Sequence, residues 1–101
     1  MNVLHDQRVS VIKALAHPSR LRIAEILSTG PACVTEIHRE IGGDLSTVSK
    51  HLTIMREAGW LTAEKNGLHI FYQLSCPCLD DFLRCIDTLA STNSCCPPQS
   101  K

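Results

Sequence analysis

One stretch of the chain, residues 45–72, constrains the fold more than any other because it joins a helical repeat to a tight hairpin. Apolar residues recur there at three- and four-residue steps, which predicts a helix with one apolar stripe made of Leu45, Val48, Leu52 and Met55. Gly59 ends this helix. Asn66-Gly67 then separates two runs of β-forming residues, which is a strong hairpin signal.

The opposite face of the predicted helix carries short hydrogen-bonding side chains and one cation: Ser46, Thr47, Ser49, Lys50 and Thr53. Such groups suit contacts with phosphates and base edges. A helix of this kind with a hairpin "wing" after it is typical of a DNA-binding module. The sequence therefore predicts double-stranded DNA, in the form of an operator, as a partner.

Length and charge narrow the class of DNA-binding protein. A chain of 101 residues with four aromatic side chains makes one small domain with a thin core, which favours a dimer that buries more surface. Ten basic residues balance ten acidic ones, so no overall positive field marks a non-specific DNA coater. A sequence-specific dimer needs only a few local cations.

The chain shows no membrane or export signal. It has no apolar run of the length that spans a bilayer and no signal-peptide pattern at its N-terminus. We therefore expect a cytoplasmic protein without membrane contact. Its six cysteines are then more typical of thiols or metal ligands than of a disulfide framework.

The remaining apolar periodicity predicts four further helices, three before residue 45 and one after the hairpin. The expected fold is mainly α, with the order helix, helix, helix, helix, strand, strand, helix. Pro18 suits the first turn of the second helix, and Asp44 is a plausible N-cap of the fourth. The predicted winged helix-turn-helix domain spans residues 1–91, and residues 92–101 form a flexible tail that contains cysteines.

Three strings resemble the arsenic-repressor (ArsR/SmtB) family of regulators. They are LAHPSRLRIAEIL at 15–27, STVSKHLTIMREAGWL at 46–61 and GLHIFYQL at 67–74. The resemblance covers about residues 8–90. It implies a homodimer that pairs through its terminal helices and represses transcription until an inducer, often a metal or metalloid ion, binds. No cofactor is expected for DNA binding itself, and no enzymatic motif is present.

The same resemblance marks DNA-facing positions. It selects Ser46, Thr47, Ser49 and Lys50, adds His51 and Arg56 within the helix, and places Lys65 and Asn66 at the wing. His51 has two interpretations, a phosphate contact or a structural bond within the helix-turn-helix. Many members have an arginine just after the wing glycine, but this chain has Leu68 and His69, so we expect a smaller wing contribution. Trp60, where the family usually has an aliphatic residue, is expected in the core.

The family's known ion sites do not fit this sequence. The segment that matches the family's CVC arsenic motif reads CVTEIH, so Cys33 remains without the thiols that complete a three-thiolate site. Cys33 is most simply a small buried residue, although Cys33 with His38 could contribute to another metal. Residues 76–96 contain no histidine, so the family's zinc site on the last helix is also absent.

The remaining cysteines predict a different thiol site. Pro77 marks a turn that can bring Cys76 and Cys78 together, and Cys95 and Cys96 are adjacent in the tail. Cys78 and Cys85 are about 10.5 Å apart along a helix, too far to share an ion, and Cys85 is expected to pack. With terminal helices pairing antiparallel, we expect two symmetric sites, each combining Cys76 and/or Cys78 of one chain with Cys95 and/or Cys96 of the other. Cys33 and Cys85 are secondary candidates.

This supply of thiolates suits As(III), with Cd(II) and Pb(II) as alternatives. A second hypothesis retains the fold but makes the cysteines a redox or reactive-sulfur sensor, for which a polysulfide is the inducer. That chemistry requires exposed thiols of low pKa.

Overall fold

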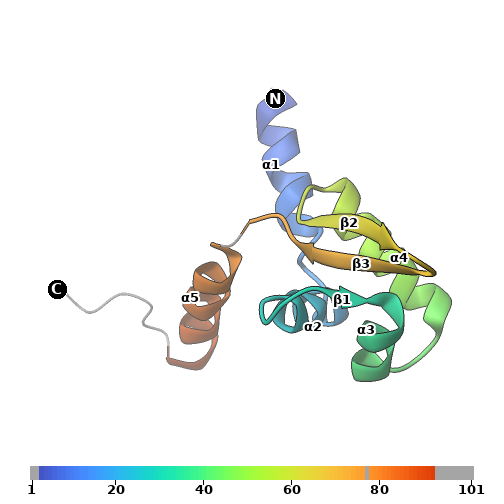
Figure 1. The fold of residues 1–101 in the computed structure, drawn as a ribbon. Helices are drawn as coiled ribbons and strands as arrows, with labels where there is room; N and C mark the ends of the chain where they lie inside the picture. The colour runs from blue at the N-terminus through green and yellow to red at the C-terminus, as the bar shows by residue number, and fades with distance from the viewer. Residues whose placement is uncertain (1–2, 77, 93–101) are drawn as a thin grey trace, which may run out of the picture.

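A body of helices carries a small sheet from which a hairpin projects (Figure 1). The computed structural model describes residues 3–76 and 78–92, and within these ranges the chain forms five helices and three strands. They are α1 (Val3–Lys13), α2 (Pro18–Leu27), β1 (Ala32–Cys33), α3 (Val34–Ile41), α4 (Leu45–Glu57), β2 (Leu61–Asn66), β3 (His69–Leu74) and α5 (Leu79–Thr92). The predicted winged helix-turn-helix is confirmed.

The sheet is antiparallel and has the strand order β1-β3-β2. Strands β2 and β3 pair from Leu61 opposite Leu74 to Asn66 opposite His69. Gly67, at φ 68°, turns the chain with a backbone conformation that favours glycine. β1 was not predicted, because two residues are too short to show strand periodicity. It pairs with β3 and places Cys33 opposite Phe71.

The core lies where α2, α3 and α4 meet. Its fully buried side chains include Ile23 on α2, Ile37 on α3, and Val48, Leu52 and Met55 on α4. Three of the four residues in the predicted α4 stripe are therefore inside.

Leu45 is the exception in that stripe, because half of its surface is exposed. It is the first residue of α4, and side chains on a helix lean toward its N-terminus. The Leu45 side chain thus extends past the end of the core, and its assignment to the buried stripe was wrong.

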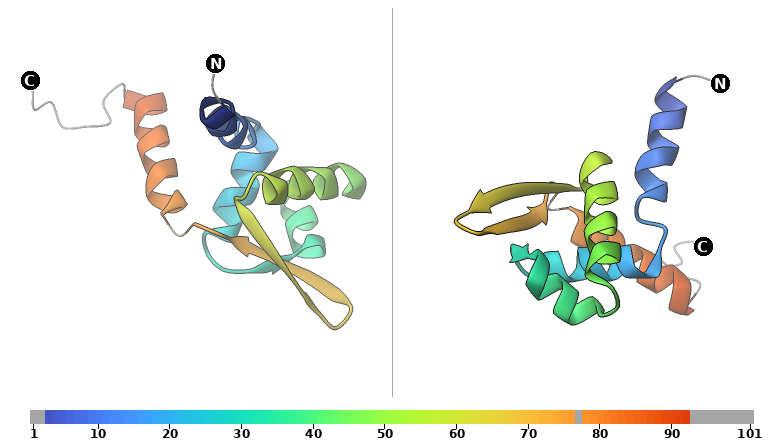
Figure 2. Two further views of the ribbon diagram at one scale, coloured as in Figure 1. Left: turned by 90° about the horizontal axis from the view of Figure 1, so that it is seen from above. Right: turned by 90° about the vertical axis from the view of Figure 1, so that its right-hand side faces the viewer.

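Helices α1 and α5 stand on the opposite side of the helical body from the hairpin tip (Figure 2). Leu79 and Leu83 on α5 are buried against the body, whereas Phe82, Ile86 and Leu89 remain exposed. Together with α1 and Trp60, α5 borders an apolar groove of about 540 Å³. α5 thus covers its own core with one edge and leaves a second apolar edge uncovered.

Replacing Leu52 with alanine tests how far the fold depends on the core of α4. Leu52 has no exposed surface, so Leu52→Ala should lower the free energy of unfolding by about 2–5 kcal/mol. Urea denaturation at fixed protein concentration measures this change. Leu68→Ala is the matched control, because Leu68 is 97% exposed at the hairpin tip and its removal should cost less than about 0.5 kcal/mol. Similar losses in both variants would contradict the assignment of the core.

Candidate functional site

The outer face of α4 presents the hydroxyl groups and the cation that the sequence analysis selected. Ser46, Thr47, Ser49, Lys50 and Thr53 are all exposed. Val48, Leu52 and Met55 on the opposite face are buried, so packing fixes which side of the helix faces outward. The structure thus confirms the predicted exposure of these five side chains, and their contact with DNA stays a prediction.

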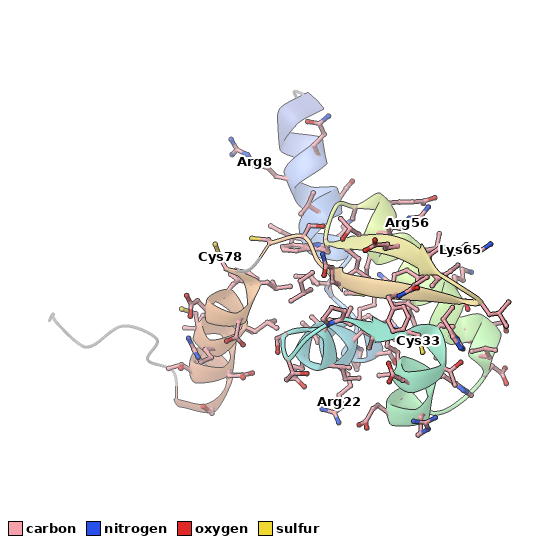
Figure 3. All side chains as sticks on the ribbon, viewed as in Figure 1. Arg8, Arg22, Cys33, Arg56, Lys65 and Cys78 are labelled. Atoms are coloured by element: carbon pink, nitrogen blue, oxygen red, sulfur yellow. The ribbon has the colours of Figure 1, made fainter. Side chains whose placement is uncertain are left out.

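Two more cations flank this helix. Arg56 lies in the last turn of α4 and Lys65 lies on β2, and both project beside the hairpin (Figure 3). Arg56, Lys65 and the neighbouring Asn66 are exposed. Leu68 and His69 are exposed at the hairpin tip, and neither supplies a permanent positive charge. The cations available near α4 are therefore local and few, in keeping with the neutral composition.

His51 does not belong to the exposed face. It is only 8% exposed, and the Nε–H of Arg20 on α2 donates a hydrogen bond to its Nδ1 at 3.1 Å. The ring of His17 lies 4.5 Å from that of His51, between centroids. Of the two interpretations of His51, the structure supports the structural bond. The inclusion of His51 among DNA-contacting residues was wrong, because the position packs against α2.

Burial and nearby positive charge both favour the neutral form of the His51 imidazole. Burial is the main cause that lowers the pKa of His51 below the ordinary histidine value, and the positive charges of His17, Arg20 and Lys50 lower it further. A neutral ring leaves Nδ1 free to accept the bond from Arg20. Sequence reasoning missed Arg20 as the residue that connects α2 to α4, although it lies within the string LAHPSRLRIAEIL.

His17 and His38 also have structural roles. His17 caps α2, where its Nδ1 accepts a hydrogen bond from the backbone N–H of Ser19 at 3.1 Å. The Nε2 of His38 lies 2.7 Å from the carbonyl oxygen of Gly43 and donates to it. His38 therefore fixes the turn between α3 and α4 rather than forming a pair with Cys33.

Cys33 is a packing residue at the start of α3. It is 7% exposed and occupies the N-cap position, where its backbone N–H donates to Glu36 Oε1 at 3.0 Å. Its burial agrees with the expectation of a small core residue. Among the described residues no group of three possible ligands forms around Cys33, so its use as an ion ligand stays a prediction.

Cys76 and Cys78 lie together between β3 and α5. Cys76 is half-buried and Cys78 is exposed at the start of α5 (Figure 3). A hydrogen bond with the Cys76 thiol, followed by repulsion from its charge, raises the pKa of Cys78. Both side chains border the apolar groove, and their joint use as ligands of one ion stays a prediction.

This thiol pair is incomplete as an ion site within the described chain. Across residues 3–76 and 78–92, no group of three histidine, cysteine, aspartate or glutamate side chains could hold a metal ion. Cys85 is exposed on α5 rather than packed as expected. Cys95 and Cys96 lie outside the described residues. A third thiolate for Cys76 and Cys78 would therefore have to come from another part of the chain or from a second copy.

Trp60 joins the end of α4 to the elements around the groove. Its indole Nε1–H donates to the carbonyl oxygen of Val11 in α1 at 2.8 Å. Sequence reasoning placed Trp60 in the core, and the structure confirms that it packs against the core cluster. The bond to Val11 was not foreseen, because the two residues are 49 positions apart and no local pattern connects them.

In the described part of the chain, no helix has the length and apolar character needed to cross a bilayer.

Comparison with known proteins agrees with this geometry. A helix-turn-helix domain family matches residues 15–62. The chain is 30% identical over 86 residues to an uncharacterised HTH-type transcriptional regulator of Methanocaldococcus jannaschii, a match that covers 84% of this chain and 97% of the relative. It is 28% identical over 87 residues to the arsenical resistance operon repressor of Staphylococcus aureus, covering 86% of this chain and 84% of the repressor.

A solved structure extends the likeness to three dimensions. The homodimeric winged helix-turn-helix DNA-binding domain of a possible ArsR-family transcriptional regulator from Mycobacterium bovis superposes with a TM-score of 0.79 at 28% identity. The match covers 89% of this chain and 83% of that one.

The histidine at position 51 should make stability depend on pH. Its lowered pKa means that the unfolded chain takes up a proton which the folded chain resists. The free energy of unfolding should therefore fall as the pH drops below the ordinary histidine value of about 6.5. His51→Gln keeps an acceptor for Arg20 without a titrating group, and it should reduce the loss of stability between about pH 7.5 and about pH 5.5.

Urea denaturation at several pH values measures this effect. His69→Gln, which removes an exposed imidazole from the hairpin, is the matched control and should leave the pH dependence as in the unaltered protein. An unchanged pH dependence in His51→Gln would show that the contact between His51 and Arg20 does not govern the acid response.

Proposed function

This chain belongs to the ArsR/SmtB family of winged helix-turn-helix transcriptional regulators, and from that membership we propose a homodimeric repressor that leaves its operator when cysteines bind a thiophilic ion, foremost As(III). Proteins of this family bind DNA and regulate transcription, and they are not enzymes. The thiol pair Cys76 and Cys78, set between the wing and α5, is the observation that carries the proposed response to an ion.

DNA binding is assigned to the exposed face of α4. Ser46, Thr47 and Ser49 are placed to contact base edges and phosphates, and Lys50 supplies the central positive charge. Thr53 and Arg56 extend this face along α4, and Lys65 with Asn66 contacts the adjacent backbone from the wing. Two copies of α4 then enter successive major grooves of a palindromic operator.

Dimerisation is assigned to the apolar surface on α1 and α5. Val9 and Ile12 on α1 and Phe82, Ile86 and Leu89 on α5 are the exposed apolar side chains of this surface. Covering them with a second copy buries apolar area that a domain of this size otherwise leaves in water. The homodimeric relative from Mycobacterium bovis supports this assignment.

The ion site combines the thiol pair with the tail of a second copy. As(OH)₃ condenses with three thiols, so that three As–S bonds form and three water molecules leave. Cys76 and Cys78 supply two of these thiols, and Cys95 or Cys96 of the other copy supplies the third. Cd(II) and Pb(II) are alternative ions for the same thiolates. The arsenical resistance operon repressor among the relatives supports As(III) as the first choice.

A redox or reactive-sulfur sensor is the alternative function, with a polysulfide as inducer. Oxidation of this kind proceeds through thiolates and is favoured by a low pKa. The pKa of Cys78 is raised instead, because Cys76 hydrogen bonds to it and repels its charge. The raised pKa of Cys78 thus does not have the direction that an oxidant sensor requires.

Substitution of Lys50 tests the DNA-binding face. Lys50→Ala should weaken operator binding at all salt concentrations and reduce the salt dependence by about one released counterion per protomer. Fluorescence anisotropy of labelled operator DNA across a salt series measures both effects. Arg22→Ala is the matched control, because Arg22 lies on α2 and pairs with Glu25 and Glu40 on the α2–α3 side. Equal effects of the two substitutions would refute the assignment of α4.

Substitution of the cysteines tests the inducer site. Cys76→Ser with Cys78→Ser, and separately Cys95→Ala with Cys96→Ala, should abolish release by As(III) while operator affinity without inducer is unchanged. Cys85→Ser is the matched control and should respond normally, because Cys85 lies two turns farther along α5. The measurement is the anisotropy of operator DNA during titration of the reduced protein with As(III), Cd(II) or a polysulfide donor.

The three titrations separate the two functions. The expected outcome is release that is complete when As(III) or Cd(II) and the protein chain are present in equal amounts. A dithiol chelator should reverse this release. Release by polysulfide alone, reversed by a simple reductant, would replace the ion-responsive repressor with a redox switch. Normal release from the Cys76 and Cys78 double variant would place the inducer site elsewhere.

A further inference from the structure

Trp60 makes hydrogen bonds to three separate elements that surround the thiol pair. Its backbone N–H donates to the carbonyl oxygen of Met55 in the last turn of α4, at 2.9 Å. Its backbone carbonyl accepts from the N–H of Ser75, the residue before Cys76, at 2.8 Å. Its indole Nε1–H donates to the carbonyl of Val11 in α1, at 2.8 Å. One residue thus contacts α1, the end of α4 and the segment that begins the thiol turn.

The Trp60 side chain also borders the same groove as the thiols. Trp60, Cys76, Cys78 and Val11 all contribute to the lining of that 540 Å³ cavity. A displacement of the segment that leads to the thiols therefore reaches Trp60 through the bond between the Ser75 N–H and the Trp60 carbonyl. On its other side, the Trp60 backbone is bonded to Met55 of α4, whose side chain is fully buried in the core.

We propose that Trp60 is the positioning residue that couples ion binding at Cys76 and Cys78 to the orientation of α4. The proposal rests on the inducible repressor proposed above. When an ion draws Cys76 and Cys78 together, Ser75 moves with the turn and pulls on the Trp60 backbone. The bond from the indole to Val11 holds the ring against α1, so the displacement passes to Met55 and the end of α4 instead of being absorbed by rotation of the ring.

The indole N–H is the part of Trp60 that can be tested alone. The other two bonds use backbone atoms and persist in any variant, whereas the bond to Val11 belongs to the side chain. Trp60→Phe removes the donor and part of the ring. Incorporation of β-(3-benzothienyl)alanine at position 60 replaces only the N–H with sulfur and keeps the size of the ring. Thermal unfolding followed by circular dichroism establishes that each protein is folded.

The experiment measures the operator dissociation constant with and without As(III) for the unaltered protein and the two forms changed at position 60. An inducer of ordinary strength weakens operator binding about a hundredfold. Loss of the indole donor should reduce that factor about fivefold, to about twentyfold, with operator affinity in the absence of As(III) unchanged. Retention of As(III) by the DNA-free protein after gel filtration should also be unchanged, because the thiols are intact.

Ser28→Ala is the matched control. It removes another side-chain bond to a backbone carbonyl, from Ser28 Oγ to Glu25 at 2.6 Å, at the end of α2. Its response to As(III) should equal that of the unaltered protein. In the unaltered protein, the fluorescence of Trp60, the chain's single tryptophan, should change on addition of As(III) without DNA.

The outcomes distinguish the two proposals. If the unaltered protein releases DNA and the benzothienyl form releases it equally, the role of Trp60 is refuted while the inducible repressor stands. If no thiophilic ion releases the unaltered protein, the inducible repressor fails and the role of Trp60 fails with it. A reduced response in both forms changed at position 60, with normal As(III) retention, supports the coupling.

Discussion

The burial of one face of α4 is the constraint on which the rest of the molecule depends. Val48, Leu52 and Met55 pack against α2 and α3 with almost no exposed surface. That packing fixes the rotation of α4 about its axis and so decides that the hydroxyl-rich face points outward. The contact between Arg20 and His51 supplements this apolar packing with a directional bond between α2 and α4. The exposed polar face of α4 is thus a consequence of the core beneath it.

Sequence periodicity predicted the helices and the hairpin because both are local patterns. It failed at Leu45, where helical spacing continues past the end of the core, and at β1, where two residues show no period. The expectation that Cys76 and Cys78 act together likewise rests on a local signal, the proline between them. The bond from Arg20 to His51 and the bond from Trp60 to Val11 were beyond such reasoning, because they join residues 31 and 49 positions apart through the tertiary fold.

The pKa of the Cys78 thiol depends on the neighbouring thiol of Cys76. When two acidic groups are adjacent, ionisation of one opposes ionisation of the other, and here the pKa of Cys78 is raised by Cys76. A raised pKa lowers the fraction of Cys78 that is present as thiolate, the form that reacts with oxidants and binds metal ions. Within the described part of the chain, Cys76 and Cys78 are the two thiols between β3 and α5. A three-coordinate ion would therefore join parts of the dimer that are separate without it.

The short strand β1 restricts how the wing can move. Ala32 and Cys33 pair with Tyr72 and Phe71, so the middle of β3 is hydrogen-bonded to the strand that ends at Cys33, the N-cap residue of α3. A two-stranded ribbon alone would bend freely about its base, but this one shares backbone hydrogen bonds with the helix-turn-helix. Rotation of the wing independently of the helix-turn-helix would therefore break the pairing of β1 with β3. Departure from the operator is then expected to break contacts at both the major groove and the flanking backbone in a single cooperative step.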